Sequence, residues 1–303
     1  MIRAFEATDP EFAEIADLLN EDGLTGQPLV TVEMVRATLT RRAPVDQRYY
    51  EQLVETHVLV ARDNSGIIGA VAYGAARTGV RDLLWLAARR CEAITILIDT
   101  VLADWPGPSH AFWYASTVSA GLEGLPRTHR RDVDTALVAR GFHGKDLRSY
   151  QVLEVVNPRP HSDVGFTTQA AITDDSGREV ARYVADLPFE GLGVLWWIEV
   201  DEAHRRRGYG RRAIGEALSV LAAHGARRVI LYVDDDDRTG ERDRGPAKAL
   251  YARVGFREVD RLWSYARGDL PPDPALGASR MADPTCTPDA PPGFSVDPTR
   301  RRT

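Results

Sequence analysis

Residues 194–212 read VLWWIEVDEAHRRRGYGRR, and this stretch decides how the second half of the chain folds. The apolar run 194–200 predicts a buried strand, and the amphipathic residues 211–226 predict a helix. Gly208 and Gly210 predict a tight turn between them. A strand that turns into a helix aims unpaired N–H groups and the positive end of the helix dipole at one point, where anions bind. Arginines flank that point at positions 205, 206, 207, 211 and 212, so we predict a site for a phosphorylated ligand.

Two nucleotide-binding motifs are alternatives for this loop. A P-loop, G-x-x-x-x-G-K-[ST], needs a lysine and then Ser or Thr, and neither follows Gly210. A dinucleotide fingerprint, G-x-G-x-x-G, has Ala213 at its third position. The relaxed form of that fingerprint accepts alanine, so spacing alone leaves it open.

A second motif, ALYARVGF at residues 249–256, follows the apolar run RRVILYV at 227–233. RRRGYG at residues 205–210 fits the pattern R/Q-x-x-G-x-G/A, and the two motifs together resemble the GCN5-related N-acetyltransferase (GNAT) superfamily over residues 166–265. The resemblance implies an α/β (α+β) fold, in which a twisted mixed, mainly antiparallel sheet is flanked by helices. It also implies acetyl-CoA as the cosubstrate.

The chain repeats its own plan. DNSG at residues 63–66 has a counterpart in DDSG at 174–177, and LRSYQV at 147–152 has one in LWSYAR at 262–267. We therefore predict two tandem GNAT folds, a degenerate N-terminal domain over residues 1–157 and an acetyl-CoA-binding domain over residues 158–267. The tail, residues 268–303, is rich in proline and small residues that cannot repay the entropy of ordering, so we expect it to be disordered.

The two halves differ at the loop and at the leading helices. The first half has two early helices, one capped by Asp9 and one from Thr31 to Arg42, but it reads AARRCEA at residues 87–93, without glycine. The second half has the glycine loop but lacks room for the early helices, which in GNAT proteins wall the acceptor pocket. We expect the second half to bind CoA, and the first half to support it and to complete the acceptor site.

The resemblance assigns the cosubstrate to one strand and one loop. The backbone of Ile198 and Val200 pairs with pantetheine, and the Val200 N–H faces the thioester oxygen. Arg244 stands where relatives have asparagine and is a candidate phosphate contact. The resemblance assigns the pyrophosphate of the cosubstrate to the loop. Its candidate binding residues are Arg205, Arg206, Arg207, Gly208, Tyr209, Gly210 and Arg211.

The transfer itself needs a proton donor and a base. Tyr251 occupies the tyrosine position of the family and can protonate the leaving thiolate, because the ordinary pKa of tyrosine is about 10 and that of a thiol about 8.5. The first half is expected to have Val138 there. Glu199, beside the expected carbonyl site, is the candidate base; Asp234, Asp235 or a chain of waters are alternatives.

Composition restricts the class of partner. The net charge of −6 and pI of about 5.7 argue against nucleic acid, which needs a basic face. The two cysteines, Cys91 and Cys286, lie far apart, and the seven histidines show no metal-ligand spacing, so no metal is expected. No signal sequence or membrane-length apolar run is present, so we expect a cytoplasmic protein without a membrane partner.

These features predict an acetyl-CoA-dependent N-acetyltransferase. We expect it to transfer an acetyl group to a primary amine of a small molecule by direct attack in a ternary complex, as a monomer or homodimer. Two alternatives stay open: a non-catalytic acyl-CoA-binding module, and a protein or peptide N-acetyltransferase.

Overall fold

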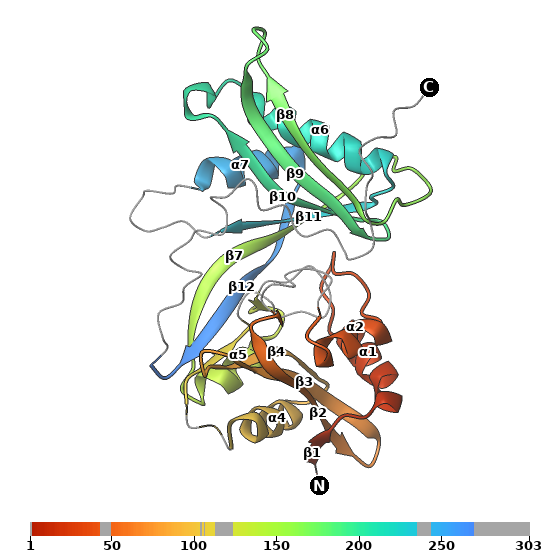
Figure 1. The fold of residues 1–303 in the computed structure, drawn as a ribbon, viewed down its shortest axis with the longest axis vertical. Coiled ribbons are helices and arrows are strands. Elements are labelled where there is room, and N and C mark those ends of the chain that lie inside the picture. The colour runs from red at the N-terminus through yellow and green to blue at the C-terminus, as the bar shows by residue number, and fades with distance from the viewer. Residues whose placement is uncertain are drawn as a thin grey trace.

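The computed structural model describes residues 2–42, 50–103, 105, 107–112, 124–234 and 244–269. Two lobes share one twelve-stranded sheet, ordered β1-β2-β3-β4-β5-β12-β7-β11-β10-β9-β8, with β6 attached to β12 (Figure 1). Among the strand pairs that the structure describes, β4–β5 and β10–β11 are parallel and the others are antiparallel. The predicted mixed, mainly antiparallel sheet is therefore confirmed, whereas the predicted tail from residue 270 onward lies outside the described residues.

The first half contains both of the early helices that were predicted for it. The second early helix is shorter than predicted and ends at Leu39. Its elements are β1 (Arg3–Glu6), η1 (Asp9–Glu11), α1 (Phe12–Glu21), α2 (Val32–Leu39), β2 (Leu53–Asp63), β3 (Gly66–Ala76), β4 (Arg81–Ala88), α4 (Cys91–Ala103), β5 (Ser109–Ala111), β6 (Leu125–Pro126), α5 (Arg131–Val138) and β7 (His143–Glu154).

The cap of the first helical segment is Thr8, so the prediction of Asp9 was wrong. Thr8 donates its backbone N–H to Glu11 at 2.8 Å and its hydroxyl at 2.6 Å. This capping-box pairing makes Asp9 the first residue inside the turn, followed by Pro10.

The second half repeats the hairpin, the crossover helix and the closing strand. Within residues 155–165, which precede its first strand, the structure has no helix, so the predicted loss of the leading helices is confirmed. Its elements are β8 (Phe166–Thr173), β9 (Glu179–Phe189), β10 (Leu192–Val200), η2 (Glu202–His204), α6 (Tyr209–Ala223), β11 (Arg228–Asp234), α7 (Gly245–Val254) and β12 (Arg257–Arg267).

The closing strands are shared between the halves. β7 of the first half pairs with β11 of the second, with Tyr150 opposite Tyr232. In turn, β12 of the second half pairs with β5 of the first, with Tyr265 opposite Ala111. β7 and β12 also pair with each other and run between the two lobes (Figure 1). The boundary that we propose at residues 157 and 158 therefore divides the chain but not the sheet.

The two faces of the second-half sheet have different covers. On one face, Ala213, Ile214, Ala217 and Leu221 of α6 pack on alternate strand residues such as Leu195. On the face opposite α6, Tyr150, Val152, Val194 and Ile230 form a separate cluster, against which Leu24 of the first half packs. A Cβ on Gly26 would lie 2.6 Å from the Tyr150 hydroxyl, so the α1–α2 loop approaches this face closely. The α1–α2 loop of the first half thus covers part of the face that the missing helices would otherwise leave exposed.

Three general features bear on the kind of site to expect. Within the described ranges, no helix is long and apolar enough to cross a membrane. The same residues contain no cluster of three or more His, Cys, Asp or Glu side chains that could hold a metal ion. Cys91 is an exposed free thiol, and Cys286 lies outside the described residues.

Candidate functional site

The loop between β10 and α6 has the backbone geometry of an anion site. Arg206 and Gly208 both have positive φ, 65° and 91°, and Gly208 is the N-cap of α6. The first helical bond runs from Arg212 N–H to Gly208 O at 3.0 Å, so no described group accepts from the N–H groups of residues 206–211. Successive N–H groups in such turns form a concave nest that binds anions.

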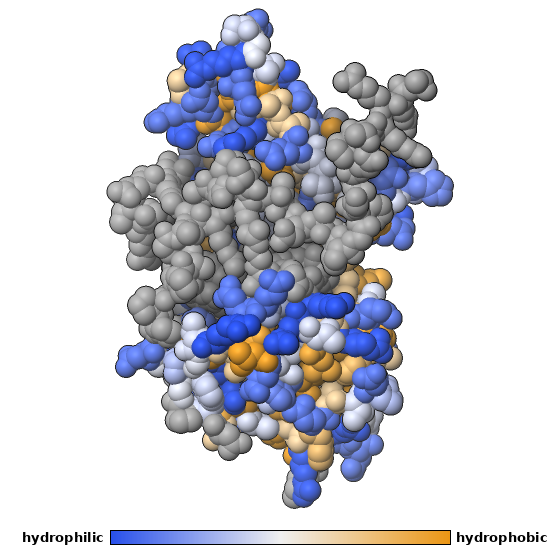
Figure 2. Space-filling view, in the orientation of Figure 1, coloured by the Kyte–Doolittle hydropathy of each residue, from blue (hydrophilic) through white to orange (hydrophobic). Residues whose placement is uncertain are grey.

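The charge of this loop is largely uncompensated. Arg212 pairs with Glu216 at 3.0 Å, and Arg205 donates to Val200 O at 3.4 Å. Arg206, Arg207 and Arg211 are exposed and have no carboxylate partner among the residues that the structure describes. In the space-filling view the surface over the end of β10 and the start of α6 is mainly hydrophilic (Figure 2). Backbone donors and three free guanidinium groups thus converge on one exposed loop.

The glycine at the cap is required by its backbone conformation. Gly208 has φ 91°, a left-handed conformation in which a Cβ is strained, although no atom lies within 4 Å of the added Cβ. Gly208→Ala is expected to cost roughly 1–3 kcal/mol of stability and to weaken CoA binding through a shifted loop. Gly215 lies within α6, also in open space but without positive φ, so Gly215→Ala is the matched control and should gain about 0.5–1 kcal/mol. Urea unfolding measures the stability of the two variants, and calorimetry measures their affinity for CoA. Equal effects of the two substitutions would contradict the loop geometry.

The corresponding junction of the first half, between β4 and α4, has neither a glycine loop nor unpaired arginines. Only Arg89 and Arg90 separate β4 from α4. Arg89 binds both carboxylate oxygens of Glu21 at 2.8 Å, and Arg90 forms an ion pair with Asp63. Both arginines of this junction are therefore neutralised, and no glycine loop precedes the helix.

This contrast predicts one CoA site per chain. Replacing Arg207 and Arg211 together by Gln should weaken CoA binding about 30-fold, because each exposed ion contact is worth about 1 kcal/mol. The loss should shrink at high salt, which screens exposed charges. The double change Arg89→Gln and Arg90→Gln should leave CoA affinity unaltered, even where it lowers thermal stability. Calorimetric titration that found the opposite order would place the coenzyme on the first half.

β10 and β11 separate beside this loop. They pair only from Leu192 to Val194, and β10 then continues to Val200 with β9 as its partner. Asp201 N–H donates to Val180 O of the β8–β9 hairpin at 2.9 Å. Because N–H directions alternate along a strand, the N–H groups of Ile198 and Val200 point to the other side, where β11 has diverged. Two main-chain donors of β10 are thereby left for a ligand that enters between the strands.

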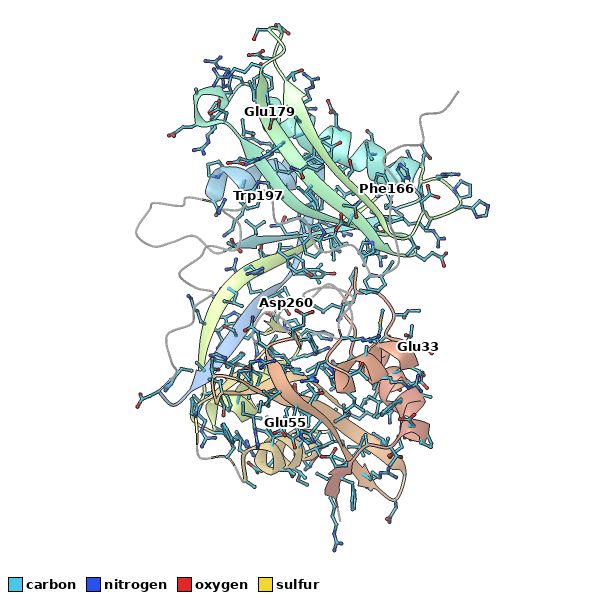
Figure 3. All side chains as sticks on the ribbon, viewed as in Figure 1. Glu33, Glu55, Phe166, Glu179, Trp197 and Asp260 are labelled. Atoms are coloured by element: carbon cyan, nitrogen blue, oxygen red, sulfur yellow. The ribbon has the colours of Figure 1, made fainter. Side chains whose placement is uncertain are left out.

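A bulge in β10 turns two tryptophans toward the same face. Val184 of β9 lies opposite Trp197, and the register shifts by one residue between Leu195 and Trp197. Leu195 and Ile198 therefore both pack toward α6, whereas Trp196 belongs to the cluster on the opposite face. Trp197 precedes Ile198 on the same strand, so by alternation it also lies on the face opposite α6; Figure 3 labels it on β10 in the upper lobe.

The motif ALYARVGF folds as the end of α7. Gly255 has φ 112°, and Phe256 N–H donates to Tyr251 O at 3.1 Å while the two rings meet edge to face at 5.9 Å. This Schellman ending fixes the orientation of Tyr251. Gly210 lets α6 approach α7 closely, because a Cβ there would lie 3.0 Å from Leu250. The structure thus brings the loop and the helix that carries Tyr251 together.

The same ending in the first half corrects the expected equivalence of Val138 and Tyr251. Phe142 N–H donates to Leu137 O at 3.2 Å, as Phe256 N–H donates to Tyr251 O. Leu137 therefore occupies the position of Tyr251, and Val138 is 53% exposed on the helix surface. The two helix endings match without a gap when Phe142 is placed opposite Phe256. The first half still has no proton donor there.

Burial governs the protonation of Tyr251. The side chain is half-buried, and burial raises its pKa, whereas the nearby charge of Arg244 lowers it. Its hydroxyl makes no hydrogen bond to another described residue. Tyr251 is therefore protonated at neutral pH and has a proton to give.

The acidic candidates are placed less favourably. Glu199 lies on the face opposite α6, where Arg182 holds its carboxylate at 2.8 Å. Asp234 pairs with Arg148 at 3.6 Å, and Asp235 lies outside the described residues. Arg244 precedes α7 as its N-cap.

Sequence reasoning missed Asp186, a buried carboxylate on β9 that accepts the Trp196 indole N–H at 2.7 Å. Its signal in the sequence was a lone acid in the apolar run ARYVADLPF.

The glycine loop, the separated strands and α7 all fall within one recognisable segment. Residues 164–256 match the acetyltransferase (GNAT) family, so this part of the chain is a GNAT domain. A mycothiol acetyltransferase from Beutenbergia cavernae is 37% identical over 86 residues, which are 28% of this chain and 27% of that protein. The match thus leaves most of that relative's length uncompared.

Two solved structures share the fold across both halves. A GCN5-related N-acetyltransferase from Sphaerobacter thermophilus has a TM-score of 0.54 at 14% identity and covers 89% of this chain and 97% of that one. A tandem GNAT protein from the clavulanic acid biosynthesis pathway has a TM-score of 0.51 at 13% identity and covers 90% and 100%. The chain therefore shares the fold of a tandem GNAT protein across both halves.

Proposed function

We propose that this protein is an acetyl-CoA-dependent N-acetyltransferase that acts on a primary amine of a small molecule. The observation that carries the proposal is the exposed nest of N–H groups at residues 206–211, beside the place where β10 leaves β11, within a GNAT domain. We expect a cytoplasmic enzyme that works as a monomer or homodimer.

The residues have distinct roles in this scheme. The N–H groups of residues 206–211 hold the pyrophosphate, supported by the free arginines, with Arg244 as a further phosphate contact. The main chain of Ile198 and Val200 orients the pantetheine, and the Val200 N–H donates to the thioester oxygen. The bound thioester supplies the acetyl group. Tyr251 gives a proton to the leaving thiolate, and its raised pKa keeps that proton in place until the thiolate forms.

Glu199 is a weaker candidate for the base than its position in the sequence indicated. Its carboxylate is engaged by Arg182, on an exposed part of the sheet. A base must reach the ammonium of the acceptor, whose own pKa of about 10 keeps it protonated at neutral pH. Glu199 acting through a water molecule stays a proposal, and the buried Asp186 is a second acid to weigh against it.

The direct test is turnover. Acetyl-CoA is incubated with a panel of polyamines, aminoglycosides and aminosugar thiols, and release of free CoA thiol is followed. We expect thiol release with at least one amine and mass-spectrometric detection of its acetyl amide. CoA binding without turnover of any amine would favour the non-catalytic acyl-CoA-binding module, and acetylation of peptides alone would favour the protein N-acetyltransferase.

A further inference from the structure

Asp186 is a buried carboxylate to which the scheme above gives no role. It lies on β9 across from Val194, and only 8% of the residue is exposed. Its neighbours Ala185 and Leu187 pack toward α6, so its side chain lies on the opposite face. Oδ2 accepts the Trp196 indole N–H at 2.7 Å, whereas Oδ1 is buried without a hydrogen bond of normal geometry in the described part of the chain.

No cation neutralises this carboxylate among the described residues. The residues paired with it across the sheet are Thr167 on β8 and Val194 on β10, its hydrogen-bond donor is Trp196, and none of these three is charged. Burial raises the pKa of Asp186, and the Trp196 indole and the Thr167 hydroxyl lower it in part. A buried acid without a cation costs stability, and such groups concentrate at ligand sites.

Asp186 also lies where the strands separate. Its partner Val194 forms the last pair between β10 and β11, with Ile230. Trp196 follows on the same face of β10, and Tyr232 belongs to the same cluster from β11. The carboxylate thus lies beside an aromatic surface at the inner end of the gap that Ile198 and Val200 line. A carboxylate next to aromatic rings is the chemistry that binds an alkylammonium ion.

The first half shows what this position looks like when it is closed. Trp85 on β4 is 2% exposed and donates its indole N–H to Thr38 of α2 at 3.3 Å. It belongs to the cluster that α1 and α2 cover. The second half has no such helices within residues 155–165, before β8. There the indole N–H of the half-buried Trp196 donates to Asp186 on β9. In the second half, Asp186 therefore accepts the indole hydrogen bond that Thr38 of α2 accepts in the first half.

We propose that Asp186 contacts the acceptor amine as its counter-ion and takes the first proton from it, with Trp196 and Tyr232 against the body of the amine. The inference rests on the proposed acetyltransferase function and names its substrate class, a small primary ammonium compound. The amine nitrogen bonds to the thioester carbonyl carbon, and the carbon–sulfur bond breaks. Asp186 passes the first ammonium proton to solvent. The second proton, lost as the amide forms, balances the one that Tyr251 gives to the thiolate.

The test measures binding of the acceptor separately from binding of CoA. Spermidine, kanamycin and glucosamine are titrated calorimetrically into the CoA-saturated protein, as wild type, Asp186→Asn and Asp163→Asn. Asp163 pairs with His224 at 2.9 Å and Arg159 at 2.9 Å away from this face, so it is the control for loss of an aspartate charge. We expect Asp186→Asn to weaken the best amine at least tenfold and to leave CoA affinity unchanged, and Asp163→Asn to alter neither.

A pH series separates contact with the amine from a structural role. Wild-type affinity for the amine should rise with pH as the carboxylate ionises, and Asp186→Asn should lose that rise. Trp196→Phe removes a hydrogen bond that lowers the pKa of Asp186, so the rise should move to higher pH. Because the folded-state pKa is raised, the stability contributed by this acid is lost as pH increases through that pKa. The melting temperature of Asp186→Asn relative to wild type should therefore be higher at about pH 8 than at about pH 4.

The outcomes are distinct. Equal amine affinity in wild type and Asp186→Asn would overturn the inference, and so would failure of every amine in the set to bind the CoA complex. Failure of the wild-type protein to bind CoA at all would instead contradict the proposed acetyltransferase function. Loss of CoA affinity in Asp186→Asn would assign the residue a structural role and would also overturn the inference.

Discussion

A fragment that begins at residue 158 is expected not to fold, although it contains the whole GNAT segment at residues 164–256. In the intact chain, β11 and β12 of the second half both pair with β7, which belongs to the first half. Removal of β7 leaves two strand edges without partners and exposes the cluster that contains Tyr150 and Val152. Unpaired edges of this kind aggregate. Residues 1–157 alone should fail similarly, because β5 loses β12.

Circular dichroism and CoA calorimetry on the two fragments measure this effect. We expect neither fragment alone to bind CoA, and co-expression of both to restore binding, since the strand pairs re-form between chains. A chain cut instead in the β8–β9 turn, at residues 174–177, is the control, because that turn is exposed and both strands stay present. Wild-type CoA affinity of the isolated fragment from residue 158 would show that the halves are independent domains.

Tyr251→Phe is expected to lower kcat about 100-fold or more while the Kd for CoA stays unchanged, since a general acid contributes at least that much. The substitution keeps the ring and its edge-to-face contact with Phe256, so the helix ending is preserved. Tyr183, which packs under α6 and whose pKa is also raised by burial, is the matched control. Tyr183→Phe should leave kcat within about twofold, as expected of a packing residue.

The pH dependence of kcat adds a signature that packing cannot imitate. A general acid works while protonated, so the rate should fall as pH rises through its pKa. Because burial raises the pKa of Tyr251, this descending limb should lie above the ordinary tyrosine value and should vanish in Tyr251→Phe. An unchanged kcat in Tyr251→Phe would remove Tyr251 from the mechanism and favour a binding module or a solvent-derived proton.

The sequence by itself determined the local elements, because their signals are local. Two glycines after an apolar run predict the N-terminus of α6, and the sequence RVGF predicts the end of α7. The duplication was also visible, because the two DxSG turns and the two closing strands repeat along the chain. The family resemblance followed from these motifs and their order.

Only the tertiary structure decided which strands meet. Hydrophobic alternation shows that β7 and β12 are half-buried strands, but it does not say whether each pairs within its own half, and here each pairs across the halves. The same limit hid Asp186, whose importance arises from its burial beside Trp196 rather than from any motif. Contacts between residues far apart in the chain depend on packing energies that no short window contains, so the loop was predictable and the burial of Asp186 beside Trp196 was not.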